Sequence, residues 1–222
     1  MEKFLEKTAL FSGLSSAEAA EVLKETGATR KSFFKGETVL SAGEAAGKFG
    51  LVTKGSVLVE YSDVWGNNSV LGKTGEGDVF AEAYAFSQSK TVPVRVIAAE
   101  DSEAIFFDAK KILSLGNDGR AFAVIKNLLT ICADKAYKLS RRIIHTSSKT
   151  IRGRLLSFFS ERIRTEGSFV FEIPFDRRRL AEYLGVDRSA LSAELSEMQK
   201  EGLIKYKKNR FEISEKAGIE KE

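Results

Sequence analysis

Arginines gather at the starts of two short helical patterns within residues 176–204. Arg177, Arg178 and Arg179 open the first pattern, where the helix dipole disfavours cations, so a phosphate backbone outside the chain would account for them. Arg188 stands in the first turn of the second pattern, from which a side chain can reach base edges in the major groove. These positions favour a DNA-binding pair of helices.

The elements that must position these arginines are predicted to be two helices joined by a tight turn. Gly185 suits a helix C-terminus because glycine readily adopts positive φ, and Asp187 stands where an N-cap acceptor belongs. An ordinary pair of packed helices would share the apolar spacing of Leu180, Ala181, Leu184, Leu191, Leu195 and Met198. The arginines, and a predicted β-hairpin with a basic tip in KYKKNRFEI, favour a winged helix-turn-helix instead.

Candidate DNA contacts divide into base-reading and phosphate-binding residues. Arginine paired with guanine is the commonest specific contact, so Arg188, Ser189 and Ser192 are expected near base edges. Phosphate contacts are expected from the helix-opening arginines, above all Arg177, and from the wing residues Lys207 and Arg210.

A heptad seam runs along a long helix predicted at residues 117–144. Its apolar positions recur at alternating steps of three and four and include no charge: Phe122, Ile125, Leu129, Cys132, Ala136, Leu139 and Ile143. A helix that covers its own domain usually has a wider, less regular stripe, so the seam predicts a homodimer. A two-fold dimer would place two recognition helices one DNA turn apart, ~34 Å, as a palindromic operator requires.

The composition is ordinary for a soluble protein of two domains: 222 residues, 43% hydrophobic and 30% charged. No apolar run approaches a membrane span and the first residues lack a signal-peptide pattern, which predicts a cytoplasmic location. Residues 1–134 carry 15 Lys and Arg against 18 Asp and Glu, whereas residues 135–222 carry 20 against 13. The basic second part is therefore expected to meet the polyanion.

The residues that most enzymes need are scarce. One cysteine, Cys132, excludes an internal disulfide and a multi-cysteine zinc or iron–sulfur site, and one histidine, His145, leaves few nucleophile–base pairs. No glycine-rich phosphate loop or metal-ligand cluster is present, so we predict no catalytic residue, no metal and no cofactor.

Short β-type runs broken by glycine fill residues 33–107 and predict a compact β-roll. Turn signals stand at Gly36, Gly43, Gly55, Gly66-Asn67-Asn68, Gly75 and Gly77, and Ser15 to Glu18 has the spacing of a capping box that opens a helix to about Thr26. The predicted class is α+β, with a β-roll domain at residues 1–116, a dimerisation helix at 117–145 and a winged helix-turn-helix at 146–222. A hinge at 145–148 and a helix at 149–164 are expected between the last two.

In this order of parts the chain resembles the CRP/FNR family of bacterial transcription regulators over nearly its full length. The most specific motifs are Lys35-Gly36-Glu37, Lys54-Gly55-Ser56-Val57, Gly77-Asp78-Val79-Phe80 and residues 180–188, LAEYLGVDR. The resemblance implies that the roll, similar to a cyclic-nucleotide-binding domain, senses an effector and that the long helix passes its state to the DNA-binding domain. It also implies RNA polymerase as a partner if the protein is an activator.

The effector residues depart from that family's cyclic-nucleotide binders, which carry a Gly-Glu pair and, further on, an arginine followed by a small residue. Here the pair reads Ala81-Glu82, the arginine's place falls at about Val92, followed by Pro93, and Arg95 is expected on the opposite strand face. A buried phosphodiester without a cation would be costly, so we expect neither cAMP nor cGMP to bind. Glu82 either contacts a different ligand or is solvated.

Other sensors of the family also lack their residues here. An iron–sulfur sensor needs several cysteines, and a haem sensor needs a ligand inside the roll, whereas His145 is expected to cap a helix end or to be solvated. Cys132 is interpreted as a small core residue, with an intersubunit disulfide still open.

Ser189 and Ala193 replace a glutamate and an arginine that are typical of the family's recognition helix, so the familiar TGTGA-type half-site is not expected. Two alternatives stay open: a module that acts through a protein partner, and a regulator whose roll no longer senses.

Overall fold

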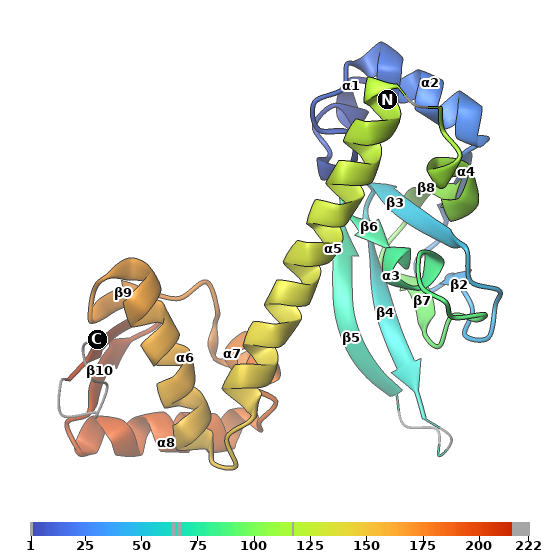
Figure 1. Ribbon diagram of the computed structural model, residues 1–222. Coiled ribbons are helices and arrows are strands. Elements are labelled where there is room, and N and C mark those ends of the chain that lie inside the picture. Colours follow the sequence, from blue (N-terminus) through green and yellow to red (C-terminus); the bar gives the residue numbers. More distant parts are fainter. Residues whose placement is uncertain (1, 64, 66–67, 117, 215–222) are drawn as a thin grey trace. The chain divides into compact units, whose positions relative to one another are not determined.

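The computed structural model describes residues 2–63, 65, 68–116 and 118–214 and divides into two compact units, Met1–Asp134 and Lys135–Glu222 (Figure 1). Both helices and sheets are present, which confirms the predicted mixed α+β class. The long helix α5 (Gly119–Thr146) begins in the first unit and ends in the second. Among the described residues no helix is long and apolar enough to cross a membrane.

The first unit is built on two antiparallel four-stranded sheets, with strand orders β1-β8-β3-β6 and β2-β7-β4-β5. Their strands are β1 (Thr29–Phe33), β2 (Thr38–Leu40), β3 (Lys48–Lys54), β4 (Ser56–Ser62), β5 (Asn68–Gly75), β6 (Val79–Phe80), β7 (Arg95–Ala98) and β8 (Ser102–Asp108). The short helices are α1 (Glu2–Leu5), η1 (Ala9–Phe11), α2 (Ser16–Thr26), α3 (Glu82–Ala85) and α4 (Ala109–Leu113). The predicted roll is therefore present.

The turn at Lys54-Gly55-Ser56 shows why glycine is needed there. Gly55 has φ +74°, a conformation that favours glycine, and a Cβ at this position would lie 2.7 Å from the carbonyl oxygen of Asp101. The turn joins β3 to β4, so these two strands enter different sheets at this point. The turn predicted at Gly66-Asn67-Asn68 includes residues 66 and 67, which lie outside the described residues.

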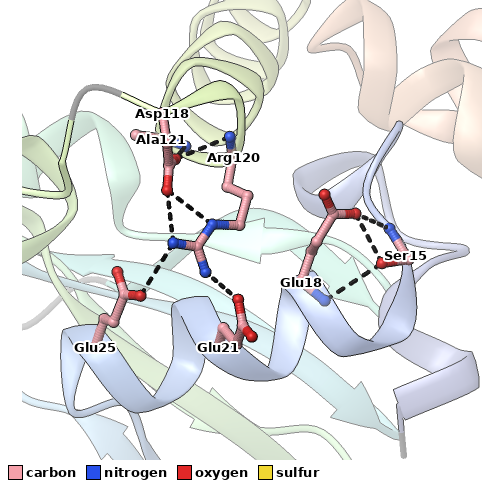
Figure 2. Close-up of polar contacts among 7 residues, drawn as sticks. All are labelled: Ser15, Glu18, Glu21, Glu25, Asp118, Arg120 and Ala121. Atoms are coloured by element: carbon pink, nitrogen blue, oxygen red, sulfur yellow. Dashed lines mark hydrogen bonds and ion pairs between the residues drawn. The ribbon is translucent and has the colours of Figure 1, made fainter.

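Two polar arrangements hold the helical end of the first unit (Figure 2). Ser15 and Glu18 form the predicted capping box, which confirms the start of α2. Arg120, in the first turn of α5, forms ion pairs with Glu21 and Glu25 of α2 and with Asp118. The start of the long helix is thereby attached to α2.

The second unit has a single core formed by helices and a small sheet. After α5 come α6 (Ile151–Glu166), β9 (Val170–Glu172), α7 (Arg177–Leu184), α8 (Arg188–Lys200), β10 (Ile204–Lys207) and β11 (Arg210–Ile213). The sheet has the order β10-β11-β9 and is antiparallel. This is the predicted winged helix-turn-helix, with the hairpin β10–β11 as its wing.

The boundary between α5 and α6 differs slightly from the prediction. Helix α5 continues through His145 to Thr146, and α6 begins only at Ile151, with Thr150 as its N-cap accepting from the Gly153 amide at 3.0 Å. The connection is therefore 147–150 rather than 145–148. His145, in the last turn of α5, is buried and is not a solvated end group.

Candidate nucleic-acid interface

The turn between α7 and α8 is fixed by local hydrogen bonds. Gly185 adopts φ 64° and ψ 44°, and the Val186 amide donates to the Ala181 carbonyl at 3.0 Å, which closes α7. The Asp187 carboxylate then caps α8, accepting from the amides of Ser189 and Ala190 at 2.8 and 2.9 Å. Hydrogen bonds from the Ser189 hydroxyl and the Ala190 amide lower the pKa of Asp187 below its ordinary value. Sequence analysis predicted both caps.

Helix α8 has one packed face and one exposed face. Leu191, Leu195 and Met198 are fully buried against the core, whereas Arg188 and Ser189 are exposed at the first turn. No hydrogen bond or ion pair holds the Arg188 guanidinium among the described residues. The arginine predicted to read bases is thus carried on a rigid helix and free to reach outward.

The two serines predicted beside Arg188 have part of their hydrogen-bonding capacity in use. The Ser189 hydroxyl donates to the Asp187 carboxylate, and the half-buried Ser192 donates to the Arg188 carbonyl at 2.9 Å. Both hydroxyl oxygens keep acceptor lone pairs. Their base contacts stay a prediction, restricted to accepting from donors on the bases.

The three arginines that open α7 have different surroundings. The Arg177 guanidinium lies 4.7 Å from the ring centre of Tyr206 and 5.0 Å from that of Phe211, and its Nη2 donates to the Lys208 carbonyl at 2.7 Å. Burial lowers the pKa of this guanidinium. Arg177 therefore holds the wing against α7. These contacts within the chain explain why an arginine stands here, whereas sequence analysis attributed it to a polyanion outside the chain.

The neighbouring cations remain at the surface. Arg178 is exposed and lies 3.5 Å from Glu182 one turn along α7, and Arg179 is exposed. Lys207 and Arg210 are exposed opposite each other at the end of the wing, where Lys208 takes a left-handed conformation with φ 55°. These four cations are accessible at the surface, and their phosphate contacts stay a prediction.

Two arginines that sequence analysis did not select fix the end of α7. Arg142 of α5 donates to the carbonyls of Tyr183 and Glu182 at 3.1 and 3.0 Å. Arg154 of α6 donates from one nitrogen to the carbonyls of Leu184 and Gly185, both at 2.9 Å. Helix ends leave such carbonyls without partners, and cations there also suit the helix dipole.

A third arginine ties α6 to α8. Arg152 forms ion pairs with Glu194 of α8 at 2.6 Å and with Glu201 at 2.7 Å, and these carboxylates, Glu201 first, raise its pKa. The recognition helix is thus positioned by polar contacts from α6 on one flank. No sequence pattern marks Arg152, because its partners lie 42 and 49 residues away.

His145 was expected at a helix end as a capping or solvated group, and that expectation is wrong. Its side chain is buried, with 2% of the residue exposed, and its ring nitrogens contact Ser157 at 3.1 Å and the Glu161 carboxylate. Glu161 also forms an ion pair with Arg141. The last turns of α5 are therefore bound to α6 by a polar cluster in which His145 is buried and Glu161 and Arg141 are partly buried.

The predicted seam of α5 is exposed. Phe122 is 71% and Leu129 70% exposed, Leu139 and Ile143 are similarly open, Ile125 and Ala136 are also exposed, and Cys132 is half-buried. A neighbouring face of the same helix is closed, since Ala121, Val124 and Leu128 are buried in the first unit. A long apolar strip left open on a helix that already has one packed face indicates a partner surface.

The predicted effector residues lie at the start of α3 and before β7. Val92 is 1% exposed within an apolar cluster, and Ala81 and Tyr84 pack against that cluster. Pro93 is exposed, as is Arg95, which pairs with Glu60 at 3.3 Å and so lies away from buried Val92 as expected. Strand β7 begins only at Arg95, so Val92 and Pro93 precede the strand on which they were expected. Glu82 is only 3% exposed, which rules out a solvated carboxylate.

Comparison with known proteins gives two matching family models and similar folds. Residues 30–118 match the cyclic nucleotide-binding domain, and residues 153–222 match the Crp-like helix-turn-helix domain. A comparison with curated proteins gives no match.

Solved structures with a similar fold cover most of the chain. The catabolite activator protein of Thermus thermophilus is 21% identical, with 96% of this chain and 96% of that chain covered and a TM-score of 0.52. CprK in its complex with OCPA is 18% identical, with 87% and 90% covered and a TM-score of 0.60. FixK2 from Bradyrhizobium japonicum is 19% identical, with 86% and 95% covered and a TM-score of 0.50. At these identities the likeness shows a shared fold.

Proposed function

We propose that this chain, which belongs to the CRP/FNR family of bacterial transcription regulators, forms a homodimer that binds a palindromic DNA operator. The family joins an effector domain to a helix-turn-helix, and both domains are present here. The function proposed is regulation of transcription and not catalysis. As a DNA-binding protein, it would act in the bacterial cytoplasm.

The observation that carries the proposal is the state of Arg188. It is exposed at the first turn of a helix whose other face is buried, and the turn before that helix is fixed by Arg154. Such a rigid platform with one free arginine suits base reading, because a specific contact needs a side chain held in a defined register. The exposed cations of α7 and the wing supply the phosphate contacts that set this register.

The proposed dimer rests on the exposed seam of α5. A two-fold axis along that strip would bury the exposed leucines and phenylalanine and would pair two copies of α8 for adjacent major grooves. Because Arg142 on the same helix holds the end of α7, a change in how the two seams meet would reach α7 and, through the turn after it, the recognition helix α8.

We further propose that the roll responds to an effector other than cAMP. A phosphodiester would need a cation at the position of Val92, and this side chain is apolar and packed. The buried carboxylate of Glu82 is a candidate contact for such an effector. A thermal-shift screen of small metabolites tests this proposal, since a ligand that binds only the folded roll raises its melting temperature.

The test of DNA recognition is a binding-site selection followed by gel shifts at several salt concentrations. Arg188→Ala should weaken binding to the selected site by about 1–3 kcal/mol and relax the preference at one base position. Lys207→Ala should weaken all sequences alike and reduce the salt dependence. Lys200→Ala is the matched control, because Lys200 is exposed at the far end of α8.

The test of the dimer is sedimentation of a seam variant. Leu129→Glu with Leu139→Glu should convert the dimer to monomers and abolish tight operator binding, whereas Thr130→Glu, on an exposed position beside the seam, should do neither.

In the binding-site selection, an unchanged base preference in Arg188→Ala would remove the recognition role from this residue. A dimer that binds no DNA would instead support a regulator that acts through a protein partner.

A further inference from the structure

A cavity of about 200 Å³ lies within the second unit, away from the roll. Three cations and three aromatic rings surround it, contributed by α5, α6, α7 and the segment before α7: Lys138, Arg141, Phe158, Arg162, Pro174, Phe175 and Tyr183. No residue of α8 or of the wing lines it. The cavity is therefore separate from the surface proposed to meet DNA.

The aromatic walls are held by one another. Phe175 and Tyr183 stack with ring centres 5.2 Å apart and an angle of 27° between their planes, and Phe158 meets Tyr183 edge-on at 5.7 Å. Aromatic pairs at these distances are favourable beyond the area that they bury. The cavity thus has rigid apolar walls suited to a planar ring.

The polar part of the lining is cationic. Arg141 pairs with Glu161 and Arg162 with Glu166, but neither carboxylate lines the cavity, and Lys138 has no ion-pair partner among the described residues. The Arg162 Nε–H is buried without an acceptor in the described part of the chain, a costly state that a ligand acceptor would relieve after a small side-chain shift.

The absence of a carboxylate from this lining distinguishes it from three other cavities. Their linings include Asp101 and Glu103, Glu76, and Asp176, respectively. An acid at the wall would repel an anion, whereas three cations without one attract it. The lining therefore selects for a negatively charged ligand.

We propose that this cavity binds a small aromatic anion, a single ring that carries a carboxylate or a phosphate. A cavity of 150 Å³ is known to accept benzene in another protein, so about 200 Å³ is room for one ring and its charged substituent. The ring would lie against Phe175 and Tyr183, and the anion would face Lys138, Arg141 and Arg162.

Occupancy of this site would connect three elements of the DNA-binding half. Arg141 belongs both to the cavity and to the cluster of Glu161 and His145, and the carbonyl of Tyr183 accepts from Arg142. A bound anion would compete with Glu161 for Arg141 and would contact α5, α6 and α7 at once. The site is therefore placed to influence how α7 is held.

The test is isothermal titration of the full chain without DNA, with benzoate, phenyl phosphate, benzyl alcohol and inorganic phosphate as separate probes. We expect benzoate or phenyl phosphate to bind, and to bind about tenfold more tightly than benzyl alcohol or inorganic phosphate, because only they offer both ring and charge. The stronger of the two identifies the charged group. Absence of binding by both, or equal binding of inorganic phosphate and phenyl phosphate, overturns the proposal.

Variants locate the site. Lys138→Ala should weaken the binding of the stronger probe about tenfold and Phe175→Leu about fivefold, while both proteins keep the far-ultraviolet circular dichroism of the parent. Lys126→Ala is the matched control, since Lys126 is exposed on α5 but does not line the cavity. Probe binding unchanged in Lys138→Ala and Phe175→Leu overturns the assignment. So does a Lys138→Ala protein whose only defect is a shallower salt dependence of DNA binding, because the cation would then contact DNA.

Discussion

The two halves of the chain differ in the exposure of their candidate functional residues. In the second unit Arg188, Lys207 and Arg210 lie at the surface of elements whose other faces are packed. In the first unit Val92 and Glu82 are buried inside the roll. Substitutions at these exposed residues of the second unit should therefore change DNA binding before stability, whereas substitutions at the buried positions of the roll should change stability first.

The largest effect is expected for Val92→Arg, which places a cation where a cyclic-nucleotide binder of the family has one. Val92 is 1% exposed among apolar side chains, so the new guanidinium would be buried largely without partners. We expect a loss of about 3–5 kcal/mol in the free energy of unfolding, measured by urea titration and circular dichroism.

Thr91→Arg serves as the control for Val92→Arg, because Thr91 is the exposed neighbour on the same segment. It should leave stability within about 0.5 kcal/mol of the parent. If Val92→Arg instead folded as stably as the parent and bound cAMP in a titration, the roll would be an intact nucleotide site that lacks only its cation. The contrast between the two halves would then disappear.

Local signals in the sequence were sufficient for the elements and caps. The helix-turn-helix follows from Gly185, Asp187 and the apolar spacing of α8, and the capping box of Ser15 predicted the start of α2. These features depend on residues three to five positions apart, where backbone geometry alone fixes the outcome.

Long-range pairings could not be predicted in this way. Arg154 meets the carbonyl of Leu184 30 residues away, and His145 meets Glu161 after the chain has turned back along α6. Arg177 was assigned to phosphate because the helix dipole disfavours a cation at the start of α7, yet the wing 31 residues later supplies a partner within the chain. Charge patterns indicate that such side chains need partners, but only the packing decides which partner lies within reach.

A second prediction concerns acid stability of the second unit. Burial raises the pKa of the Glu161 carboxyl, but hydrogen bonds from Arg141 and His145 and their charges outweigh it, so the pKa lies below the ordinary value of 4.5. A lowered pKa means that the ionised carboxylate stabilises the fold above about pH 4.5, and that this contribution is lost as the pH falls through the lowered value.

Glu161→Gln removes that contribution. Near pH 7 the free energy of unfolding of the variant should be about 1–3 kcal/mol lower than that of the parent, because charge-assisted hydrogen bonds to Arg141 and His145 are lost. The deficit should shrink as the pH falls below the pKa of Glu161, where the parent carboxyl is also protonated. Urea titrations between pH 7 and pH 3 measure this, with Glu166→Gln as the control on the same helix. A deficit that stayed constant over that range would assign Glu161 a packing role only.

The smallest predicted effect compares one residue from each half. Apart from glycines, two described residues have positive φ: Ala81 in the roll, φ 62°, and Lys208 in the wing, φ 55°. A side chain in this conformation costs about 1–2 kcal/mol relative to glycine, and part of any gain on substitution is offset by the greater freedom of glycine in the unfolded chain. Ala81→Gly and Lys208→Gly should therefore each stabilise their unit by about 0.5–1 kcal/mol.

The two glycine variants should differ in their affinity for DNA. Ala81→Gly introduces, at a half-buried position, the glycine that cyclic-nucleotide binders of the family carry before the glutamate, so it should raise the melting temperature and leave operator affinity unchanged. Lys208→Gly removes a cation from the exposed end of the wing, so it should raise the melting temperature and yet weaken binding and reduce its salt dependence. If both variants weakened DNA binding alike, the roll would be coupled to recognition without any effector, and surface and interior would not be functionally distinct.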